Sequence, residues 1–165
     1  MVPLAHPGGG LATRDDLVAW LDGHTDFERA MPTRALAPTL RRIEELCRVL
    51  GDPERACPVI HLTGTNGKGS TARILSELLR ADGLRVGTYT SPNLHTVAER
   101  LARNGQPIDG DSLAAVLAEL ALLEPLLAER PTRFELLTAA ALSWFATEAV
   151  DSMVCLLYTS DAADE

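Results

Sequence analysis

A short stretch of the chain, from Gly64 to Thr71, concentrates the residue types that bind phosphate. Its positions are Gly64, Thr65, Asn66, Gly67, Lys68, Gly69, Ser70 and Thr71. Glycines permit positive φ angles and a close approach of phosphate oxygens, and successive backbone N–H groups form an anion nest. The ammonium group of Lys68 would neutralise the β- and γ-phosphates, and the hydroxyl of Ser70 or Thr71 would reach Mg²⁺. The stretch therefore predicts a site for a nucleotide phosphate.

The spacing of this stretch differs from the common phosphate-loop pattern G-x-x-x-x-G-K-[ST]. The first glycine of that pattern would fall on Leu62, and Gly69 stands where a hydroxyl residue would follow Lys68. The simpler alternative is a glycine-rich turn with a surface lysine. We favour phosphate binding because a strand-forming run, glycines, a lysine, hydroxyls and a helix occur in the required order.

The residues around the stretch predict a strand, a turn and a helix. Residues 58–63 form a run of strand-forming residues, and we expect a buried strand with His61 packed inside it. Residues 71–81 follow with helical spacing, and residues 85–90 predict a second strand, so the connecting helix implies a parallel, right-handed crossover. The expected inner face of that helix consists of Ile74, Leu75, Leu78 and Leu79.

Spacing, capping and turn signals place the other elements. They are a helix over 14–22 capped by Thr13, a helix over 36–50 with its apolar face at Leu36, Leu40, Ile43, Leu46 and Leu50, a hairpin at Asn104 and Gly105, a helix over 111–127 with a kink at Pro125, a helix from the capping box of Thr132 and Glu135 to about 149, and a strand over 150–158. Residues 1–12 contain three consecutive glycines and are expected to be a flexible leader. Strands that alternate with helices indicate an α/β fold.

Composition limits the classes of protein and partner. The 165 residues carry 15 Lys and Arg against 23 Asp and Glu, a net charge of −8, and 46% of them are apolar. This mixture is typical of one globular domain, and it argues against nucleic acid as a partner because phosphate backbones require a basic face. Three sparse cysteines fit a reducing compartment, and neither a membrane span nor a secretory signal is evident. We therefore expect a cytoplasmic protein that binds no membrane.

The stretch from Thr63 to Thr71 resembles the ATP-binding signature of the Mur ligase superfamily. Its flanks are similar to the folylpolyglutamate synthase/dihydrofolate synthase family within that superfamily, and the resemblance covers about residues 15–151. The segments that carry it are Val59-Ile60-His61, Tyr89-Thr90-Ser91-Pro92, Glu99-Arg100, Asn104-Gly105-Gln106-Pro107-Ile108 and Phe134-Glu135-Leu136-Leu137-Thr138-Ala139-Ala140-Ala141. They occur in the order of the family and at similar intervals.

The resemblance implies an α/β fold of a definite kind, a P-loop-containing, three-layer, Mur-ligase-type ATP-binding domain with a parallel sheet. It also implies an ATP-dependent amide ligase that adds L-glutamate to dihydropteroate, to folyl(poly)glutamate or to both, through an acyl phosphate. Residues 64–71 would bind ATP, and Lys68 would be catalytic by stabilising the transferred phosphoryl group. Ser70, Ser91 and Glu135 would hold Mg²⁺. Full-length members are expected to be monomers whose partners are these small molecules.

The metal positions also have structural interpretations. Glu135 stands three residues after Thr132 and is also explained as the last residue of a capping box, and Ser91-Pro92 is also explained as the start of a turn. In the family, residues that precede the core shape the pterin pocket. The residues at this place in the chain are Asp26, Phe27 and Arg29.

The chain departs from the family pattern at two positions and at its end. Asn93 stands where a histidine is common and Ala98 where an asparagine is common, which affects the expected substrate preference more than ATP binding. Residues 152–165 are expected to be a non-native tail, and the C-terminal ligase domain of the family is absent. The chain is therefore interpreted as an N-terminal fragment, with residues 13–151 as the truncated ATP-binding domain, inactive by itself. The alternatives are a Mur-type cell-wall peptide ligase and a non-catalytic nucleotide-binding fragment.

Overall fold

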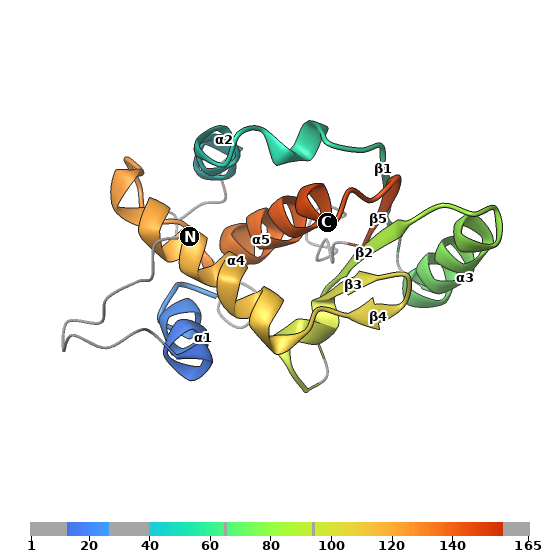
Figure 1. Ribbon diagram of the computed structural model, residues 1–165, viewed down its shortest axis with the longest axis horizontal. Coiled ribbons are helices and arrows are strands. Elements are labelled where there is room, and N and C mark those ends of the chain that lie inside the picture. The colour runs from blue at the N-terminus through green and yellow to red at the C-terminus, as the bar shows by residue number, and fades with distance from the viewer. Residues whose placement is uncertain (1–12, 27–39, 65, 94, 157–165) are drawn as a thin grey trace, which may run out of the picture. The chain divides into compact units, whose positions relative to one another are not determined.

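The structure of the chain, a computed structural model, divides into two compact units. It describes residues 13–26, 40–64, 66–93 and 95–156. The helical unit consists of the described residues up to Glu54 together with Asp109–Trp144, and the sheet unit consists of those in Arg55–Ile108 together with those from Phe145 on. Figure 1 labels the helices and strands of both units, and the boundary between the units falls within α5 (Arg133–Thr147).

A five-stranded mixed sheet forms the core of the sheet unit. In spatial order its strands are β1 (Val59–Leu62), β5 (Ser152–Leu156), β2 (Val86–Thr90), β3 (Leu101–Arg103) and β4 (Gln106–Pro107). β5 is parallel to β1 and to β2, so the predicted parallel relation of β1 and β2 is confirmed, with β5 between them. The hairpin of β3 and β4 adds antiparallel strands, because Asn104 and Gly105, with φ of 51° and 78°, reverse the chain as predicted.

Helix α3 (Lys68–Ala81) packs on one face of this sheet, against β5 and β2 (Figure 1). The buried core on this face consists of Ala72, Val86, Val154 and Leu156, with Leu62, Leu75, Leu79 and Leu84 packed around it. The prediction that Ile74 and Leu78 belong to the inner face is wrong, since these side chains are 61% and 63% exposed. Ser76 takes the inner position instead, and its hydroxyl lies 3.3 Å from that of Thr88 on β2.

The opposite face of the sheet is covered at β2 by Phe145. Side chains alternate between the two faces of a strand, and Val86 lies in the core under α3. A side chain at the next position, Gly87, would therefore project from the opposite face. A Cβ atom at residue 87 would lie 2.9 Å from ring atoms of Phe145. Glycine is therefore required here by a close approach of an aromatic ring to the strand backbone.

Strand β1 forms one edge of the described sheet, and this corrects the expectation of a buried strand. Val59 is 44% exposed, and His61 is exposed as well, because β1 pairs with β5 on one side only. His61 was expected to be packed, and the structure places it on the face opposite to the α3 core.

The end of the described chain is a central strand. Ser152–Leu156 forms β5, whose five residues are all buried between β1 and β2. The boundary drawn from the sequence between residues 151 and 152 therefore does not coincide with a structural boundary, while the non-native origin of 152–165 stays a prediction. Residues 157–165 and the expected leader, residues 1–12, lie outside the described residues.

Side chains define the helix starts of the helical unit. Its described elements are α1 (Arg14–Asp22), α2 (Leu40–Val49), α4 (Gly110–Leu123), the 3₁₀ turn η4 (Glu124–Leu126) and α5 up to Trp144. The other 3₁₀ turns among the described residues are η2 (Pro53–Arg55) and η3 (Val97–Arg100). Thr13 caps α1 and Asp109 caps α4 by accepting backbone N–H groups. The helix predicted over 111–127 with a kink at Pro125 ends earlier, at Leu123, and Pro125 lies in η4 instead. None of the helices in the described part of the chain is long and apolar enough to cross a membrane.

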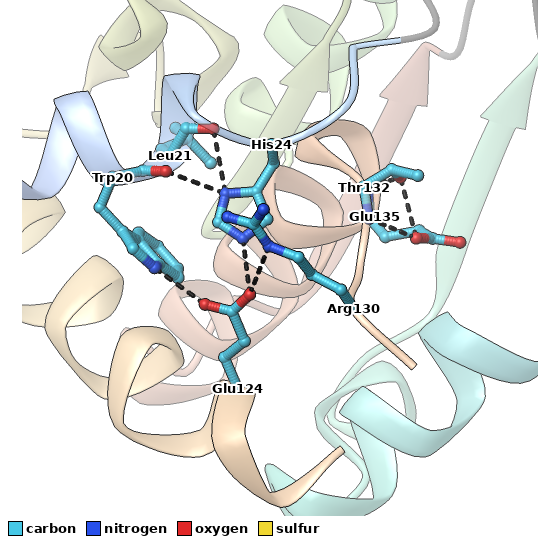
Figure 2. A network of polar contacts seen from close by, with 7 residues as sticks. All are labelled: Trp20, Leu21, His24, Glu124, Arg130, Thr132 and Glu135. Atoms are coloured by element: carbon cyan, nitrogen blue, oxygen red, sulfur yellow. Dashed lines mark hydrogen bonds and ion pairs between the residues drawn. The ribbon is translucent and has the colours of Figure 1, made fainter. Parts of the chain in front are cut away.

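A buried histidine joins the end of α1 to η4 (Figure 2). Nδ1 of His24 lies 2.9 Å from the carbonyl oxygen of Trp20, and Nε2 lies 2.8 Å from Oε1 of Glu124. The two ring nitrogens thus link the last turn of α1 to the carboxylate of Glu124 in η4. Burial raises the pKa of Glu124, but the hydrogen bonds that it accepts outweigh burial and lower this pKa, so the carboxylate is ionised.

The substitution Gly87→Ala tests the close approach of Phe145. We expect the free energy of unfolding in urea to fall by about 1–3 kcal/mol, because the added methyl group must displace the ring in a filled core. Phe145→Leu in the same background should recover part of this loss, since the smaller side chain makes room. An unchanged denaturation midpoint for Gly87→Ala would contradict the packing.

The substitution Asp151→Asn tests an ion pair next to β5. Hydrogen bonds from the side chain and the backbone N–H of Arg85 lower the pKa of Asp151 from 3.8 to about 2. The folded state thus favours the charged form, and its stabilisation is present above pH 3.8 and is lost as the pH falls through about 2. We expect Asp151→Asn to lower the melting temperature at neutral pH, with a difference from the native chain that disappears in this acid range. A difference that persists down to the lowest pH would contradict the assignment.

Candidate functional site

The phosphate-binding stretch predicted from the sequence lies between β1 and α3. β1 ends at Leu62 and α3 begins at Lys68, which confirms the predicted order of strand, turn and helix. Gly64 and Gly67 have φ of 135° and 73°, a conformation that residues with a Cβ atom rarely adopt. The turn therefore requires glycine at these two positions. Thr65, the remaining predicted position before Asn66, lies outside the described residues.

The N-terminus of α3 has no side-chain cap, in contrast to the capped starts of α1 and α4. Its N-cap residue is Gly67, and its first turn contains no acidic residue. The first N–H groups of a helix find no acceptor within the helix and carry its partial positive charge. Asn66, Gly69 and Ser70 are exposed beside this end. Within the part of the chain that the structure covers, this end of α3 thus suits an anion.

Two side chains complete the turn. Nζ of Lys68 donates to the carbonyl oxygen of Gly64, so the ammonium group lies over the turn. The hydroxyl of Thr71 donates to the carbonyl oxygen of Gly67 at 3.0 Å and thereby anchors the first turn of α3. Backbone N–H groups, an ammonium group and the exposed Ser70 hydroxyl are thus gathered in one turn. This arrangement is chemically suited to bind a polyphosphate.

Ser91 follows β2 directly and lies at the same edge of the sheet as the turn. Leu156 of β5 is paired with Leu62 on one side and with Thr90 on the other. β1 and β2, which flank β5, therefore end at the same level, about 10 Å apart across two strand spacings. Ser91 itself is buried, with 3% of its surface exposed. The carboxyl edge of the parallel strands thus brings together the predicted phosphate site and one predicted metal ligand.

Glu135 belongs to the helical unit, whereas Ser70 and Ser91 belong to the sheet unit. Oε2 of Glu135 accepts hydrogen bonds from the backbone N–H of Thr132 at 2.7 Å and from its hydroxyl at 2.8 Å (Figure 2). The N–H of Glu135 in turn donates to the Thr132 hydroxyl, so the capping-box interpretation is confirmed. This finding leaves the metal role of Glu135 as a prediction, since a carboxylate has acceptor capacity for both.

An arginine that the sequence analysis did not select also contacts Glu135. Nε of Arg42, on α2, lies 3.1 Å from both carboxylate oxygens, and 8% of the arginine is exposed. The predicted apolar face of α2 is shifted, because Leu40 is 74% exposed while Arg42 is buried with Leu46 and Cys47. The sequence contained one signal for the burial of Arg42. It stands four residues before Leu46, and residues with this spacing lie on the same face of a helix.

Other residues considered from the sequence have structural partners. Asn93 accepts a hydrogen bond at 2.7 Å from Nε of the buried Arg100, so this departure from the family pattern fixes the arginine. Asp26 lies 3.8 Å from Arg133 in the helical unit. Phe27 and Arg29 lie outside the described residues.

The acidic residues, histidines and cysteines of the described segments do not form a metal centre by themselves. Among the described residues there is no group of three or more that could hold a metal ion. Burial raises the pKa of Cys47 and of Cys155 to about 11, so these thiols stay protonated. A bound cation would thus depend on hydroxyl and phosphate oxygens besides a carboxylate.

Comparisons with known proteins agree on one family. The chain is 34% identical over 157 residues to the dihydrofolate synthase/folylpolyglutamate synthase of Mycobacterium tuberculosis, with 88% of this chain and 32% of that protein covered. The structure of folylpolyglutamate synthetase from Lactobacillus casei matches with a TM-score of 0.78 and 34% identity, over 92% of this chain and 37% of that chain. A complex of FPGS with AMPPCP and folate matches with a TM-score of 0.76 and 33% identity, over 88% of this chain and 35% of that chain.

The matches cover only part of each relative. The chain spans about a third of the length of the curated relatives from Mycobacterium tuberculosis, Bacillus subtilis and Lacticaseibacillus casei. No protein-family model matches it. The matched structures have a Mur-ligase-type fold, so the predicted α/β, Mur-ligase-type fold is confirmed for the matched part of the chain.

Two glycines of the turn form a matched pair for testing its geometry. A Cβ atom would meet nothing within 4 Å at Gly67 or at Gly69, but only Gly67 has a positive φ, 73°. We expect Gly67→Ala to lower the free energy of unfolding by about 1–2 kcal/mol and to weaken polyphosphate binding, because the left-handed conformation is strained. Gly69→Ala should leave stability unchanged or raise it. Equal effects of the two substitutions on urea denaturation would contradict the described turn.

Proposed function

Because this chain belongs to the folylpolyglutamate synthase/dihydrofolate synthase family, we propose that the protein containing it is an ATP-dependent amide ligase. It joins L-glutamate to dihydropteroate, to folyl(poly)glutamate or to both, through an acyl phosphate. The names of the relatives support this assignment, and the matched FPGS complex with AMPPCP and folate supports ATP and a folate as substrates.

The observation that carries the proposal is the uncapped, glycine-bounded start of α3 at the carboxyl edge of the parallel strands. Ligands of open α/β sheets bind outside this edge. We propose that residues 64–71 bind the phosphates of ATP there, through backbone N–H groups and the ammonium group of Lys68.

The proposed reaction has two displacement steps. A carboxylate oxygen of the folate substrate attacks the γ-phosphorus of ATP, the bond from that phosphorus to the β-phosphate oxygen breaks, and ADP leaves. The amino group of glutamate then attacks the acyl carbon, loses a proton, and expels inorganic phosphate through a tetrahedral intermediate. Phosphoryl transfer depends on positioning and charge neutralisation rather than on covalent help from the protein. Lys68 and the N–H groups of α3 supply both, which makes Lys68 the proposed catalytic residue.

We propose that Ser70, Ser91 and Glu135 hold Mg²⁺, which would neutralise charge on the phosphates when bound. Mg²⁺ prefers oxygen ligands, and these three residues offer two hydroxyls and a carboxylate. The chemistry of Glu135 fits this role, because Oε1 accepts a hydrogen bond from Arg42 alone in the described contacts and keeps acceptor capacity. Ser91 fits as a buried hydroxyl at the carboxyl edge of the sheet.

The cellular setting of the whole protein is also a proposal. A net charge of −8 supports small molecules rather than nucleic acid as partners. We propose a monomer that works in the cytoplasm and binds no membrane.

An assay with labelled glutamate tests the proposed reaction. The whole protein is incubated with ATP, Mg²⁺, labelled L-glutamate and a pteroate, a folate or a UDP-linked peptide acceptor. We expect label in the pteroate or folate product together with equal amounts of ADP and phosphate. Label in the UDP-linked peptide would instead indicate a Mur-type cell-wall ligase, and ATP binding without turnover would indicate a non-catalytic nucleotide-binding protein.

The substitution Lys68→Ala tests the catalytic assignment in the whole protein. We expect kcat/KM to fall by roughly 10²- to 10³-fold or more, because one contact to charge in the transition state is lost. The melting temperature should change little, since Lys68 is the first residue of α3 and lies outside the apolar core. Arg73→Ala, which removes an exposed cation from the same helix, is the matched control and should keep its activity. Near-native turnover by a folded Lys68→Ala protein would contradict the role.

A further inference from the structure

We propose that Arg42 is a positioning residue that fixes the carboxylate of Glu135, so that Oε1 alone is presented to a divalent cation. This inference rests on the proposed function, in which Glu135 is a Mg²⁺ ligand. Arg42, Thr132 and Glu135 all lie in the helical unit, so the inference uses contacts within that unit only.

The hydrogen bonds of Glu135 distinguish its two oxygens. Oε2 accepts three, from the N–H and the hydroxyl of Thr132 at 2.7 and 2.8 Å and from Nε of Arg42 at 3.1 Å. Oε1 accepts one, from the same Nε at 3.1 Å. An ionised carboxylate has about four acceptor positions, roughly two on each oxygen. Oε2 is thus saturated, and the remaining capacity of the group lies on Oε1.

A capping box does not by itself require this arrangement. Glutamine serves in such a box as well as glutamate, so the charge of Glu135 has another use. Burying an arginine beside it costs desolvation free energy that a helix cap does not need to spend. Both side chains are nonetheless about nine-tenths buried, with 8% of Arg42 and 10% of Glu135 exposed. Nη2 of Arg42 is buried and has no hydrogen-bond partner among the described residues, which indicates a guanidinium held for orientation rather than for full pairing.

The charges around Arg42 still favour a cation at Oε1. Nη1 of Arg42 lies 3.4 Å from Glu129, so the cluster contains one positive and two negative groups and sums to −1. The guanidinium therefore does not cancel the attraction of the carboxylate for a cation. Its contact with both oxygens restricts rotation of the carboxylate plane, and Thr132 decides which oxygen is covered. Groups that orient a metal ligand in this way typically affect metal affinity by about 10- to 100-fold.

The test measures Mn²⁺ affinity of the 165-residue chain in the presence of AMPPCP, by electron paramagnetic resonance. Glu135→Gln should weaken Mn²⁺ binding, and Arg42→Met should weaken it by about tenfold or more. Arg42→Lys, which keeps the charge but not the fork of donors, should give a smaller loss. Arg133→Met is the matched control, because it removes another buried arginine of the same unit, paired with Asp22 at 3.0 Å, and should leave Mn²⁺ affinity unchanged.

The sign of the Arg42 effect decides the inference. Removal of a positive charge alone should tighten cation binding, so tighter or unchanged Mn²⁺ binding by a folded Arg42→Met chain would overturn the positioning role. If Arg42→Met does not fold, Arg42→Lys decides, and native Mn²⁺ affinity there would overturn the role. If Glu135→Gln itself leaves Mn²⁺ affinity unchanged, the proposed metal role of Glu135 fails together with this inference. A loss in Glu135→Gln without a loss in the Arg42 variants rejects the inference alone.

Discussion

The place of the proposed phosphate site in the sheet unit follows from the way β5 pairs with its two neighbours. β5 is parallel to β1 and to β2. Because Leu156 pairs with both Leu62 and Thr90, β1 and β2 end at the same level. The glycine turn after β1 and Ser91 after β2 therefore emerge at the same edge, with one strand between them. If β1 and β2 were direct neighbours, these segments would be about 5 Å apart, which leaves less room for a phosphate group.

The electrostatics of the turn depend on the first backbone N–H groups of α3, which no side chain caps. Helices α1 and α4 cover their first N–H groups with Thr13 and Asp109, while α3 begins at a glycine that offers no oxygen from a side chain. The chain thereby keeps a partial positive charge next to Lys68, at a cost in helix stability of roughly a few tenths of a kcal/mol for glycine in place of a capping side chain. A helix start that binds an anion is expected to lack a side-chain cap, because the oxygens of the ligand accept the hydrogen bonds of its N–H groups.

Local signals in the sequence predicted the order of the elements and the position of the glycine-rich turn. The glycines of the turn, the cap at Thr13, the capping box of Thr132 and Glu135 and the Asn104-Gly105 hairpin each depend on neighbouring residues, so their positions agree with the structure. Which face of a helix is buried depends on distant partners, and the exposed Ile74 and Leu78 show that apolar spacing alone does not decide it. The central place of β5 and the contact of Arg42 with Glu135 join segments far apart in the chain, and no local pattern encodes them.

Backbone amide NMR shifts during titration with AMPPCP and with adenosine test the proposed phosphate site most directly. The account predicts that AMPPCP shifts the amide signals of Gly67, Lys68, Gly69 and Ser70 more than those of the rest of α3. Adenosine, which lacks phosphate, should leave these signals in place. Equal shifts with both compounds, or shifts confined to residues away from the start of α3, would contradict the assignment of this turn as the site for the phosphates of ATP.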